Sequence, residues 1–582
     1  MQTRIAHLIH EAIARGIERG ELPNEAHLPV GEIGVMVPRQ KEHGDFSSNI
    51  VFVLAKRLKR PPVEIGPILA RSIREIEDPE IASVTFLPPG FLNFSLARGA
   101  WFAFLEDLHR QGEAYGTNDL GKGERVNIEF VSVNPTGPVH VGHGRNAAVG
   151  DALARVLSAC GYAVTREYYI NDAGNQMNLL ARSVHARYLE LLGRSVAFPE
   201  DGYHGAYIRE IARALLERDG TKWADRPEAE WLPLFRTFAR EVCLREIEAT
   251  MQAFRVSFDV WTSEQTLHDR GAITACIDRL QAAGRIYEKD GALWFRSSDY
   301  GDEKDRVVRR ANGELTYLAA DIAYHEDKFQ RGFDTLIDVW GADHHGYIPR
   351  MKAAVAALGH DPDAFVVLLI QLVHLKRGEE LVPMSKRAGE LITLQDVIDE
   401  VGVDAARYFF LTKHTDTTLD FDLELAKRKD RENPVYYVQY VHARICQIIR
   451  KAYCEATGEA EREAAAIPLA EVIDRVIPSY DAVELERLTL AEEIDIIKAL
   501  QKFPSVVEGA GRSREPHRIT NFLQEMASAF HFYYTAGTRD AAKRVLCPDP
   551  ALQKARLFLI AAVRIVLSNA FTLLGVSAPE RM

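Results

Sequence analysis

The sequence predicts an α/β fold: a Rossmann-like domain with a parallel sheet and a helical insertion, between a small α+β N-terminal domain and an all-α C-terminal domain. The chain has 582 residues, enough for several domains of about 150 residues each. After Val126, short β-branched runs alternate with helical patterns, which is typical of a parallel sheet, and strand signals fade after about residue 430. We place the domains at residues 1–115, 120–430 with the insertion at about 185–300, and 431–582.

The composition is that of a folded, soluble chain. Hydrophobic residues make up 47% and charged residues 26%, which excludes a disordered or fibrous protein. The net charge is −12, so a nucleic-acid partner would have to meet local basic patches. The six cysteines are scattered, without a CxxC pair or a Cys/His cluster, so we expect neither a disulfide framework nor a zinc knuckle.

The termini and apolar stretches predict a cytoplasmic protein with no membrane segment. Met1 begins a charged amphipathic pattern and not an apolar signal segment. The apolar stretch 365–375 is too short to span a bilayer, and 557–578 is interrupted by Arg564 and Asn569. We interpret the two stretches as a buried strand and a core helix.

The first domain should open with a helix, because apolar residues recur at helical spacing over 5–13, and residues 33–37 resemble a strand. The basic run 56–60 stops at Pro61, where a helix would end, and a solvated helix end is favoured over an RNA contact. Residues 115–121 form a predicted linker.

The second domain is predicted to contain strands and helices, and the third is predicted to be helical. Strands are expected at 126–133, 164–170, 336–340 and 365–375, and helices at 147–157, 347–358, 434–451 and 516–534.

One segment, residues 131–146, stands where the first strand of this sheet ends and a helix begins. Ligands bind at such positions in open parallel sheets, and helix N-terminal amides favour phosphate. His140 and His143 flank Gly142, so two imidazoles could donate to a phosphate while the glycine allows close approach. The segment predicts an ATP site, and the alternative is a pair of histidines satisfied at a helix cap.

A second segment follows the last strand in a charged, glycine-punctuated loop that contains Met384, Ser385 and Lys386. A loop lysine can close over a triphosphate and stabilise charge as pyrophosphate leaves. Alone the tripeptide would be ordinary loop, but together with the histidines it supports a nucleotide-activating site.

These two segments resemble the HIGH and KMSKS signatures of class I aminoacyl-tRNA synthetases. More specifically, the sequence is similar to arginyl-tRNA synthetases of the bacterial type. The stretches that carry this resemblance are 134–143, 169–176, 340–345 and 433–444, with 44–49 and 89–94 in the N-terminal domain.

The resemblance implies ATP-dependent attachment of L-arginine to its cognate tRNA through an arginyl-adenylate, with release of AMP and pyrophosphate. It implies that His140, His143 and Lys386 are the catalytic groups and that Mg²⁺ enters bound to ATP. It also implies that tRNA is needed for the first step and that the N-terminal domain contacts the tRNA elbow. We expect a monomer.

The chain departs from the KMSKS pattern at two positions. Pro383 stands where the first lysine would be, and Arg387 replaces the final serine. Family members that lack the loop lysine often carry a lysine just before the HIGH histidines, but here that position is Gly137. The departure leaves Lys386 as the expected catalytic cation.

Recognition of arginine requires a forked acceptor, because guanidinium is planar and permanently charged. Tyr317 and Asp321 are four residues apart, hence on one helix face. By resemblance they bind the guanidinium, and Asn134 lies near the substrate amino group. Without the resemblance, an unremarkable surface pair would be favoured.

Residues 341–345 follow a predicted strand, and we assign Gly341, Asp343 and His345 to the ATP site. The competing interpretation of Asp343, His344 and His345 is a metal site, which a lone triplet supports poorly, so no metal ligands are predicted. Three further polar residues, Asn171, Asp172 and Gln176, either line the pocket or cap the next helix.

In the helical domain, Tyr436, Tyr440 and Arg444 share one helix face, with His442 nearby. Aromatic and arginine side chains stack on unpaired RNA bases, although such a stripe is more often core. The resemblance makes this domain the expected binder of the anticodon stem and loop.

Two alternatives stay open. A synthetase for another amino acid is the first, although a cysteinyl enzyme would be expected to show zinc ligands. A non-catalytic tRNA-binding relative is the second, and the intact His140, His143 and Lys386 argue against it.

Overall fold

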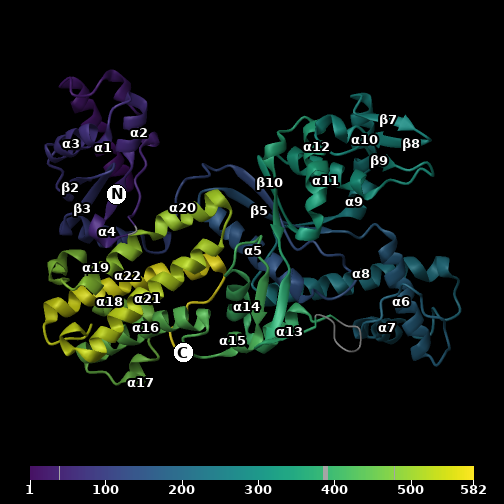
Figure 1. Ribbon diagram of the computed structural model, residues 1–582. Helices are drawn as coiled ribbons and strands as arrows, with labels where there is room; N and C mark the ends of the chain where they lie inside the picture. The colour runs from purple at the N-terminus through teal and green to yellow at the C-terminus, as the bar shows by residue number, and fades with distance from the viewer. Residues whose placement is uncertain (39, 384–390, 478) are drawn as a thin grey trace. The chain divides into compact units, whose positions relative to one another are not determined.

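The computed structural model describes residues 1–38, 40–383, 391–477 and 479–582 (Figure 1). These residues form two compact units. Unit 1 comprises Met1–Gly112, Ile448–Gln501 and Phe532–Val563, and unit 2 comprises Glu113–Gln447, Lys502–His531 and Arg564–Met582. The domain boundaries drawn from the sequence stay a prediction, because the units are grouped by packing and not by order along the chain.

Unit 1 begins with an α+β arrangement. Its antiparallel sheet has the order β1-β3-β2 and is accompanied by four helices. The expected strand at 33–37 is reduced to one bridge between Met36 and Ser47. The bounds are α1 (Gln2–Glu18), β1 (Phe46–Ser48), α2 (Ile50–Leu58), α3 (Pro62–Arg74), β2 (Ile81–Leu87), β3 (Phe91–Leu96) and α4 (Arg98–Gln111).

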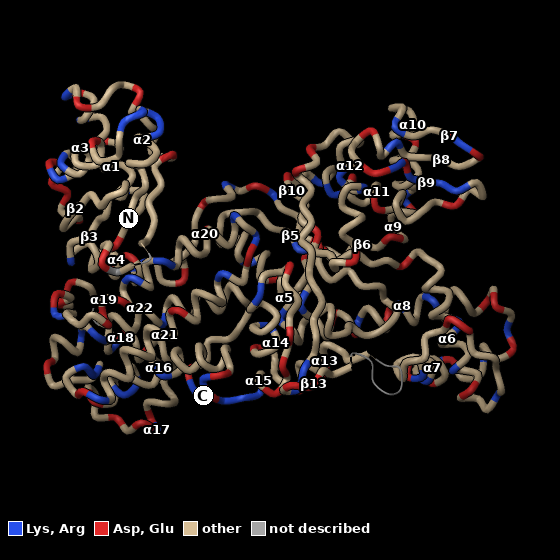
Figure 2. The backbone as a smooth tube through the Cα atoms, in the orientation of Figure 1, with Lys and Arg blue, Asp and Glu red and all other residues tan. Residues whose placement is uncertain are grey.

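The first helix forms because Ile5, Ile9 and Ile13 recur on one face, and all three are fully buried. The predicted helix end after α2 is also found: Lys59 adopts a left-handed conformation that stops the helix. The basic run 56–60 is the blue stretch at the end of α2 in Figure 2.

The main sheet of unit 2 is parallel, with the order β11-β10-β4-β5-β6. In chain order this is 5-4-1-2-3, the doubly wound arrangement, and the direction of winding reverses between β4 and β10. Ligands bind at the carboxyl ends of the strands beside such a switch point. The bounds are β4 (Arg125–Glu129), β5 (Ala163–Ile170), β6 (Val260–Ser263), β10 (Thr335–Gly341) and β11 (Phe365–Ile370).

Two of the expected strands differ from the structure. The first ends at Glu129, because Val131 and Ser132 take positive φ and turn the chain. The expected strand at 365–375 is divided into β11 and β12 (Val373–Arg377), which belong to different sheets. The second of these sheets has the order β13-β12-β14, with β13 at Glu380–Leu381 and β14 at Leu419–Asp422.

The region 185–300 is mostly helical, as expected, but it also contributes β6 to the main sheet. The helices there are α6 (Asn175–Leu191), α7 (Ala206–Asp219), α8 (Glu228–Ala253), α9 (Glu264–Asp269) and α10 (Ala272–Ala282). An antiparallel sheet follows, formed by β7 (Ile286–Lys289), β8 (Ala292–Phe295) and β9 (Arg306–Arg309).

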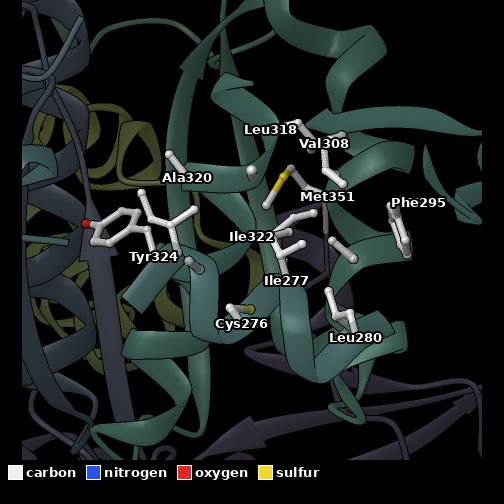
Figure 3. Close-up of a cluster of buried hydrophobic side chains, with 14 of the residues drawn as sticks. Cys276, Ile277, Leu280, Phe295, Val308, Leu318, Ala320, Ile322, Tyr324 and Met351 are labelled. Carbon is white, nitrogen blue, oxygen red and sulfur yellow. The ribbon is translucent and has the colours of Figure 1, made fainter. Parts of the chain in front are cut away.

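The helix α11 (Tyr317–Gln330) is fixed by a hydrophobic core on one side. Figure 3 shows Leu318 and Ile322 of α11 gathered with Ile277 of α10 and Met351 of α12 (Ile348–Leu358). Because this face of α11 is anchored, the orientation of its other residues is fixed as well, including Asp321.

The remaining helices are largely C-terminal. They are α5 (Val141–Ala159), α13 (Leu394–Val401), α14 (Val403–Phe410), α15 (Leu423–Lys427), α16 (Pro434–Thr457), α17 (Glu461–Ala464), α18 (Leu469–Val476), α19 (Ala491–Gln501), α20 (Phe503–Ser513), α21 (His517–Arg539) and α22 (Pro550–Leu574). Among the described residues, α22 alone has the length and composition to cross a membrane, but 72% of its most apolar window is buried in the protein. A core helix meets the same criterion.

Candidate active site

A cavity of about 1460 Å³ opens at the carboxyl ends of β4, β10 and β11. Its walls come from the turn after β4, the first turn of α5, one face of α11, the residues after β10, and the loop 202–207 before and into α7. The cavity therefore lies at the switch point of the sheet, where a nucleotide is expected.

His140 and His143 both line this cavity. His140 is the N-cap of α5: its Nδ1 accepts a hydrogen bond from the Gly142 N–H at 3.1 Å. An accepting Nδ1 leaves the proton on Nε2, so His140 can donate from Nε2 to a ligand. The cap alternative is thus correct for one nitrogen, and it leaves the other available for binding.

The two imidazole rings lie 3.5 Å apart, centroid to centroid. Burial lowers the pKa of both, and with the neighbouring His140 it brings the pKa of His143 to about 3. Both rings are therefore neutral at pH 7, and Nδ1 of His143 is buried with no hydrogen-bond partner in the part of the chain that the structure describes. Two neutral donors side by side suit an anionic ligand that brings its own charge.

Asp321 of α11 also lines the cavity and accepts a hydrogen bond from the Tyr347 hydroxyl. Burial raises its pKa to about 6, against the hydrogen bond from Tyr347, which lowers it. Tyr317 is 60% exposed and does not line the described cavity. Its hydroxyl lies near Gly174, where a Cβ would be 3.4 Å from it, so its assignment to arginine binding stays a prediction.

The sequence-based reasoning missed Glu129, which ends β4 and lines the cavity. The strand register places it beside Asp338 of β10 and Glu167 of β5, so three carboxylates stand abreast. The signal was present in the sequence as an acidic residue within a predicted strand of a parallel sheet, a kind of sheet that is buried on both faces, where an acidic residue is rare without a charged partner.

Two cations neutralise this carboxylate row, one near the end of α11 and one at its C-cap. Lys328, fully buried, places its Nζ 2.6 Å from Glu129 and 3.1 Å from Asp338, and Arg331 binds Glu167 at 2.8 Å. Burial raises the pKa of Glu129 even against the attraction of Lys328. A cationic ligand in the cavity would add a second partner for this carboxylate.

Asn134 lines the cavity, and its Nδ2 donates to Gln176 Oε1 at 2.6 Å. Asn171 lines it as well. Asp172 instead accepts from Arg240 at 2.7 Å and from Ser263 at 2.8 Å, which ties strand β5 to α8 and β6. The N-cap of α6 is Gly174, so neither Asn171 nor Asp172 caps this helix, and Gln176 lies within it.

Gly341 and Asp343 line the cavity at the end of β10, together with His344, whereas His345 does not. A Cβ at Gly341 would lie 2.5 Å from Asp343 Oδ1, so a side chain at this position would displace the exposed carboxylate of Asp343. The placement of His345 leaves its role in ATP binding a prediction.

The loop 202–207 closes one side of the cavity near the HIGH segment. The Tyr207 hydroxyl donates to the Thr136 carbonyl at 2.6 Å, and a Cβ at Gly137 would lie 2.8 Å from that hydroxyl. A side chain at 137 would therefore meet Tyr207.

Lys386 and Arg387 lie outside the described residues, so the predicted role of Lys386 stays a prediction. The residues after that segment are described: Thr393 forms a bridge with His140, and Ile392 accepts from Val141 N–H at 3.0 Å. The chain that leaves the predicted loop is therefore paired with the HIGH segment.

No group of three or more His, Cys, Asp or Glu side chains in the described ranges is arranged to hold a metal ion. Asp343 and His344 approach each other at 3.5 Å, but they form a pair and not a ligand cluster. The donor set therefore gives no support to a protein-held metal at this site.

On α16, Tyr436 and Tyr440 stack with ring centroids 6.1 Å apart, and the guanidinium of Arg444 lies 5.0 Å from the Tyr440 ring centre. The ring of His531 of α21 stacks on the neighbouring Tyr437, with ring centroids 4.3 Å apart. The three predicted side chains do share one half-buried face, whereas His442 is buried and bonded to the Pro579 carbonyl at 2.9 Å.

The doubly wound sheet with two histidines at its switch point is the architecture of a class I tRNA synthetase catalytic domain. Residues 105–428 match the family model described as "tRNA synthetases class I (R), catalytic domain". Residues 3–96 match "Arginyl tRNA synthetase N terminal domain", and 438–582 match "DALR anticodon binding domain".

Individual proteins that the chain resembles point to the same family. The chain is 48% identical over 582 residues to an arginine–tRNA ligase of Syntrophotalea carbinolica, covering 100% of both, and 44% identical over 576 residues to one of Bacillus licheniformis, covering 99% and 98%. The arginyl-tRNA synthetase of Thermus thermophilus, at 23% identity, shares the fold with a TM-score of 0.71 over 100% of both chains. The chain belongs to the arginyl-tRNA synthetase family, so the resemblance predicted from the sequence is confirmed.

Proposed function

We propose that the protein attaches L-arginine to its cognate tRNA in an ATP-dependent reaction that passes through an arginyl-adenylate. The observation that carries the proposal is that Glu129 and Asp321 line the same cavity as His140 and His143. A cationic amino acid and an anionic nucleotide would thus find opposite charge or neutral donors in one space at the switch point.

The two carboxylates suit a guanidinium. The guanidinium of arginine is planar and permanently charged, and carboxylates bind it through parallel hydrogen bonds. Asp321, with a pKa of about 6, is ionised at pH 7 and ready to accept. Asn134, whose Nδ2 donates to Gln176, would accept from the substrate amino group through Oδ1.

The arginine carboxylate attacks the α-phosphorus of ATP, forming the acyl-phosphate bond as the bond to pyrophosphate breaks. No covalent enzyme intermediate is needed, so the protein contributes orientation and charge stabilisation. His140 and His143 donate hydrogen bonds to phosphate oxygens, Gly142, Gly341 and Asp343 line the nucleotide site, and Lys386 supplies positive charge. Mg²⁺ enters as part of the MgATP substrate.

In the second step the terminal ribose hydroxyl of the tRNA attacks the arginyl carbonyl, and AMP leaves. The proposed anticodon-binding face comprises Tyr436, Tyr440 and Arg444, on which unpaired bases can stack. The N-terminal domain would meet the tRNA elbow. We propose a cytoplasmic monomer that needs tRNA for the first step.

Pyrophosphate exchange into ATP, measured with each of the twenty amino acids and with or without tRNA, tests this function. Exchange with arginine alone, dependent on tRNA, is the expected result. Exchange with another amino acid would keep the adenylate chemistry and discard the arginine pocket. No exchange from folded protein that binds ATP and tRNA would support a non-catalytic tRNA-binding protein.

The arginine pocket has its own test in Asp321→Asn. The amide replaces an acceptor with a donor that faces guanidinium, so discrimination of arginine from uncharged citrulline should fall. Unchanged discrimination would remove Asp321 from the pocket.

A further inference from the structure

The chain turns sharply just after β4, at Val131 and Ser132. Their φ angles are 69° and 41°, in the left-handed region that L side chains avoid. Val131 is β-branched and only 9% exposed, so contact of its side chain with solvent does not offset the strain of its backbone. Such backbone persists only where the surrounding structure holds it.

Asn146 of α5 holds this turn through its side-chain amide. Its Oδ1 accepts from the Val131 N–H at 2.7 Å, and its Nδ2 donates to the Val339 carbonyl at 2.8 Å. Val131 follows β4 and Val339 lies in β10, the two strands beside the switch point. One amide therefore joins the two sides of the site, and both of its polar atoms are engaged by the protein backbone.

Neighbouring contacts fix the residues on either side of the turn. Before it, the Phe130 ring packs on α5 so closely that a Cβ at Gly150 would lie 2.2 Å away. After it, the Tyr168 hydroxyl donates to the Val133 carbonyl at 2.9 Å, and Ser132 Oγ accepts from Tyr169 N–H at 3.0 Å. The N–H of Val131, at the strained position itself, is bound by Asn146.

The turn lies between two residues of the proposed arginine site. Glu129 precedes Val131 by two residues and Asn134 follows it by three, and both line the cavity. A relaxed, extended conformation at Val131 would send the following chain in a different direction and separate these two side chains.

We propose that Asn146 is a positioning residue for arginine recognition, which holds the left-handed turn that sets Glu129 and Asn134 on one wall of the cavity. This inference rests on the proposed arginylation. Asn146 also lines the cavity, but both polar atoms of its amide bind the protein backbone, so it is proposed to act through the turn. Because His140 and His143 are held by the start of α5 and not by the turn, loss of the turn should affect arginine much more than ATP.

The test measures KM for arginine and for ATP in steady-state arginylation of cognate tRNA, for Asn146→Ala, Val131→Gly and the double variant. Asn146→Ala should raise the arginine KM about tenfold, since the strain at Val131 is then unopposed, and change the ATP KM less than about threefold. Glycine adopts positive φ without steric cost, so Val131→Gly should recover at least about threefold of that loss in the double variant.

Asn118→Ala is the matched control. Asn118 also uses both amide atoms, toward Cys160 and the Leu120 N–H, at the other end of α5. It should leave the arginine KM unchanged while lowering stability to a similar degree. If Asn146→Ala does not fold, a folded double variant with nearly normal arginine KM supports the proposal, and an equally unfolded double variant overturns it.

An unchanged arginine KM in Asn146→Ala, equal rises in both KM values, or no recovery with Val131→Gly would overturn the proposal while the function stands. A wild-type protein that fails to arginylate tRNA would instead overturn the proposed function.

Discussion

The Nζ atom of Lys328 lies 2.6 Å from Oε2 of Glu129, and both side chains are largely removed from water. Burial would lower the pKa of Lys328, but the attraction of Asp338 and Glu129 outweighs burial and raises it. The cation and its carboxylates depend on one another, because none could be ionised alone at this depth.

Replacement of Lys328 by Met should therefore destabilise unit 2 by about 3 to 5 kcal/mol, since it leaves buried carboxylates without a partner. Thermal unfolding at pH 7.5 measures it. Lys352→Met, which removes the exposed pair with Asp363, is the control and should cost less than about 1 kcal/mol. Equal losses in the two variants would contradict a buried network.

Asp321 should give arginine binding a pH dependence. Burial raises its pKa to about 6, and the protonated acid cannot accept both hydrogen bonds of a guanidinium. The arginine KM should rise about tenfold per pH unit below that pKa. Asp321→Asn should lose this dependence, and a wild-type profile that is flat between pH 5 and 7 would show that another group carries the charge.

The same shift predicts an effect on stability without substrate. Since the folded-state pKa lies above the ordinary value of 3.8, the folded protein holds this proton more tightly than the unfolded chain. Its contribution is fully present below about pH 4 and is lost as the pH rises through about 6. Asp321→Asn should thus be about 3 kcal/mol more stable than wild type at pH 7.5, and nearly equal in stability at pH 4. Thermal midpoints at the two pH values decide this.

His143 should act as a neutral donor over the whole working range. Its pKa of about 3 predicts no change in rate from its titration between pH 6 and 8. His143→Ala should lower the rate of adenylate formation about 100- to 1000-fold in single-turnover experiments, and His143→Asn, which keeps an N–H, should lower it less.

His185 offers the control for that substitution. It is also a half-buried histidine with a lowered pKa, but it stacks on Trp231, with ring centroids 3.7 Å apart, inside the helical region of the insertion. His185→Ala should affect stability and leave the adenylate rate within about threefold. Similar rate losses in both variants would indicate a general effect of removing a buried ring.

The sequence was sufficient to locate His140 and His143, because a strand, a glycine and a helix start are local features. It could not show where β4 ends. The β-branched run 126–133 reads as one strand, but Val131 takes a left-handed conformation and its N–H binds Asn146 Oδ1 instead of a neighbouring strand. The partner is fifteen residues away in the chain.

The run 365–375 shows the same limit. Its apolar character continues through Gln371, but there the backbone leaves the main sheet and its N–H binds the Thr415 carbonyl at 2.9 Å. A hydrophobic pattern indicates burial, and it does not indicate which strand provides the hydrogen bonds. Glu129 was missed for a related reason, since its partner Lys328 lies 199 residues further along the chain.

Gly575, just after α22, should tolerate no side chain. Its φ is 65°, and a Cβ would lie 2.3 Å from Nη2 of Arg407. Arg407 is fully buried, binds Asp151 of α5 and donates to the carbonyls of Leu574 and Phe254. A methyl group at 575 would force this guanidinium away from partners that it cannot replace with water.

Gly458 separates the steric effect from backbone strain. It also follows a long helix with positive φ, 76°, but a Cβ there meets nothing within 4 Å. Gly458→Ala should cost about 1 kcal/mol, from the left-handed backbone alone. Gly575→Ala should cost at least about 3 kcal/mol, because displacement of Arg407 also leaves Asp151 without its buried partner. Thermal midpoints of the two variants make the comparison, and equal shifts would mean that Arg407 moves aside without loss.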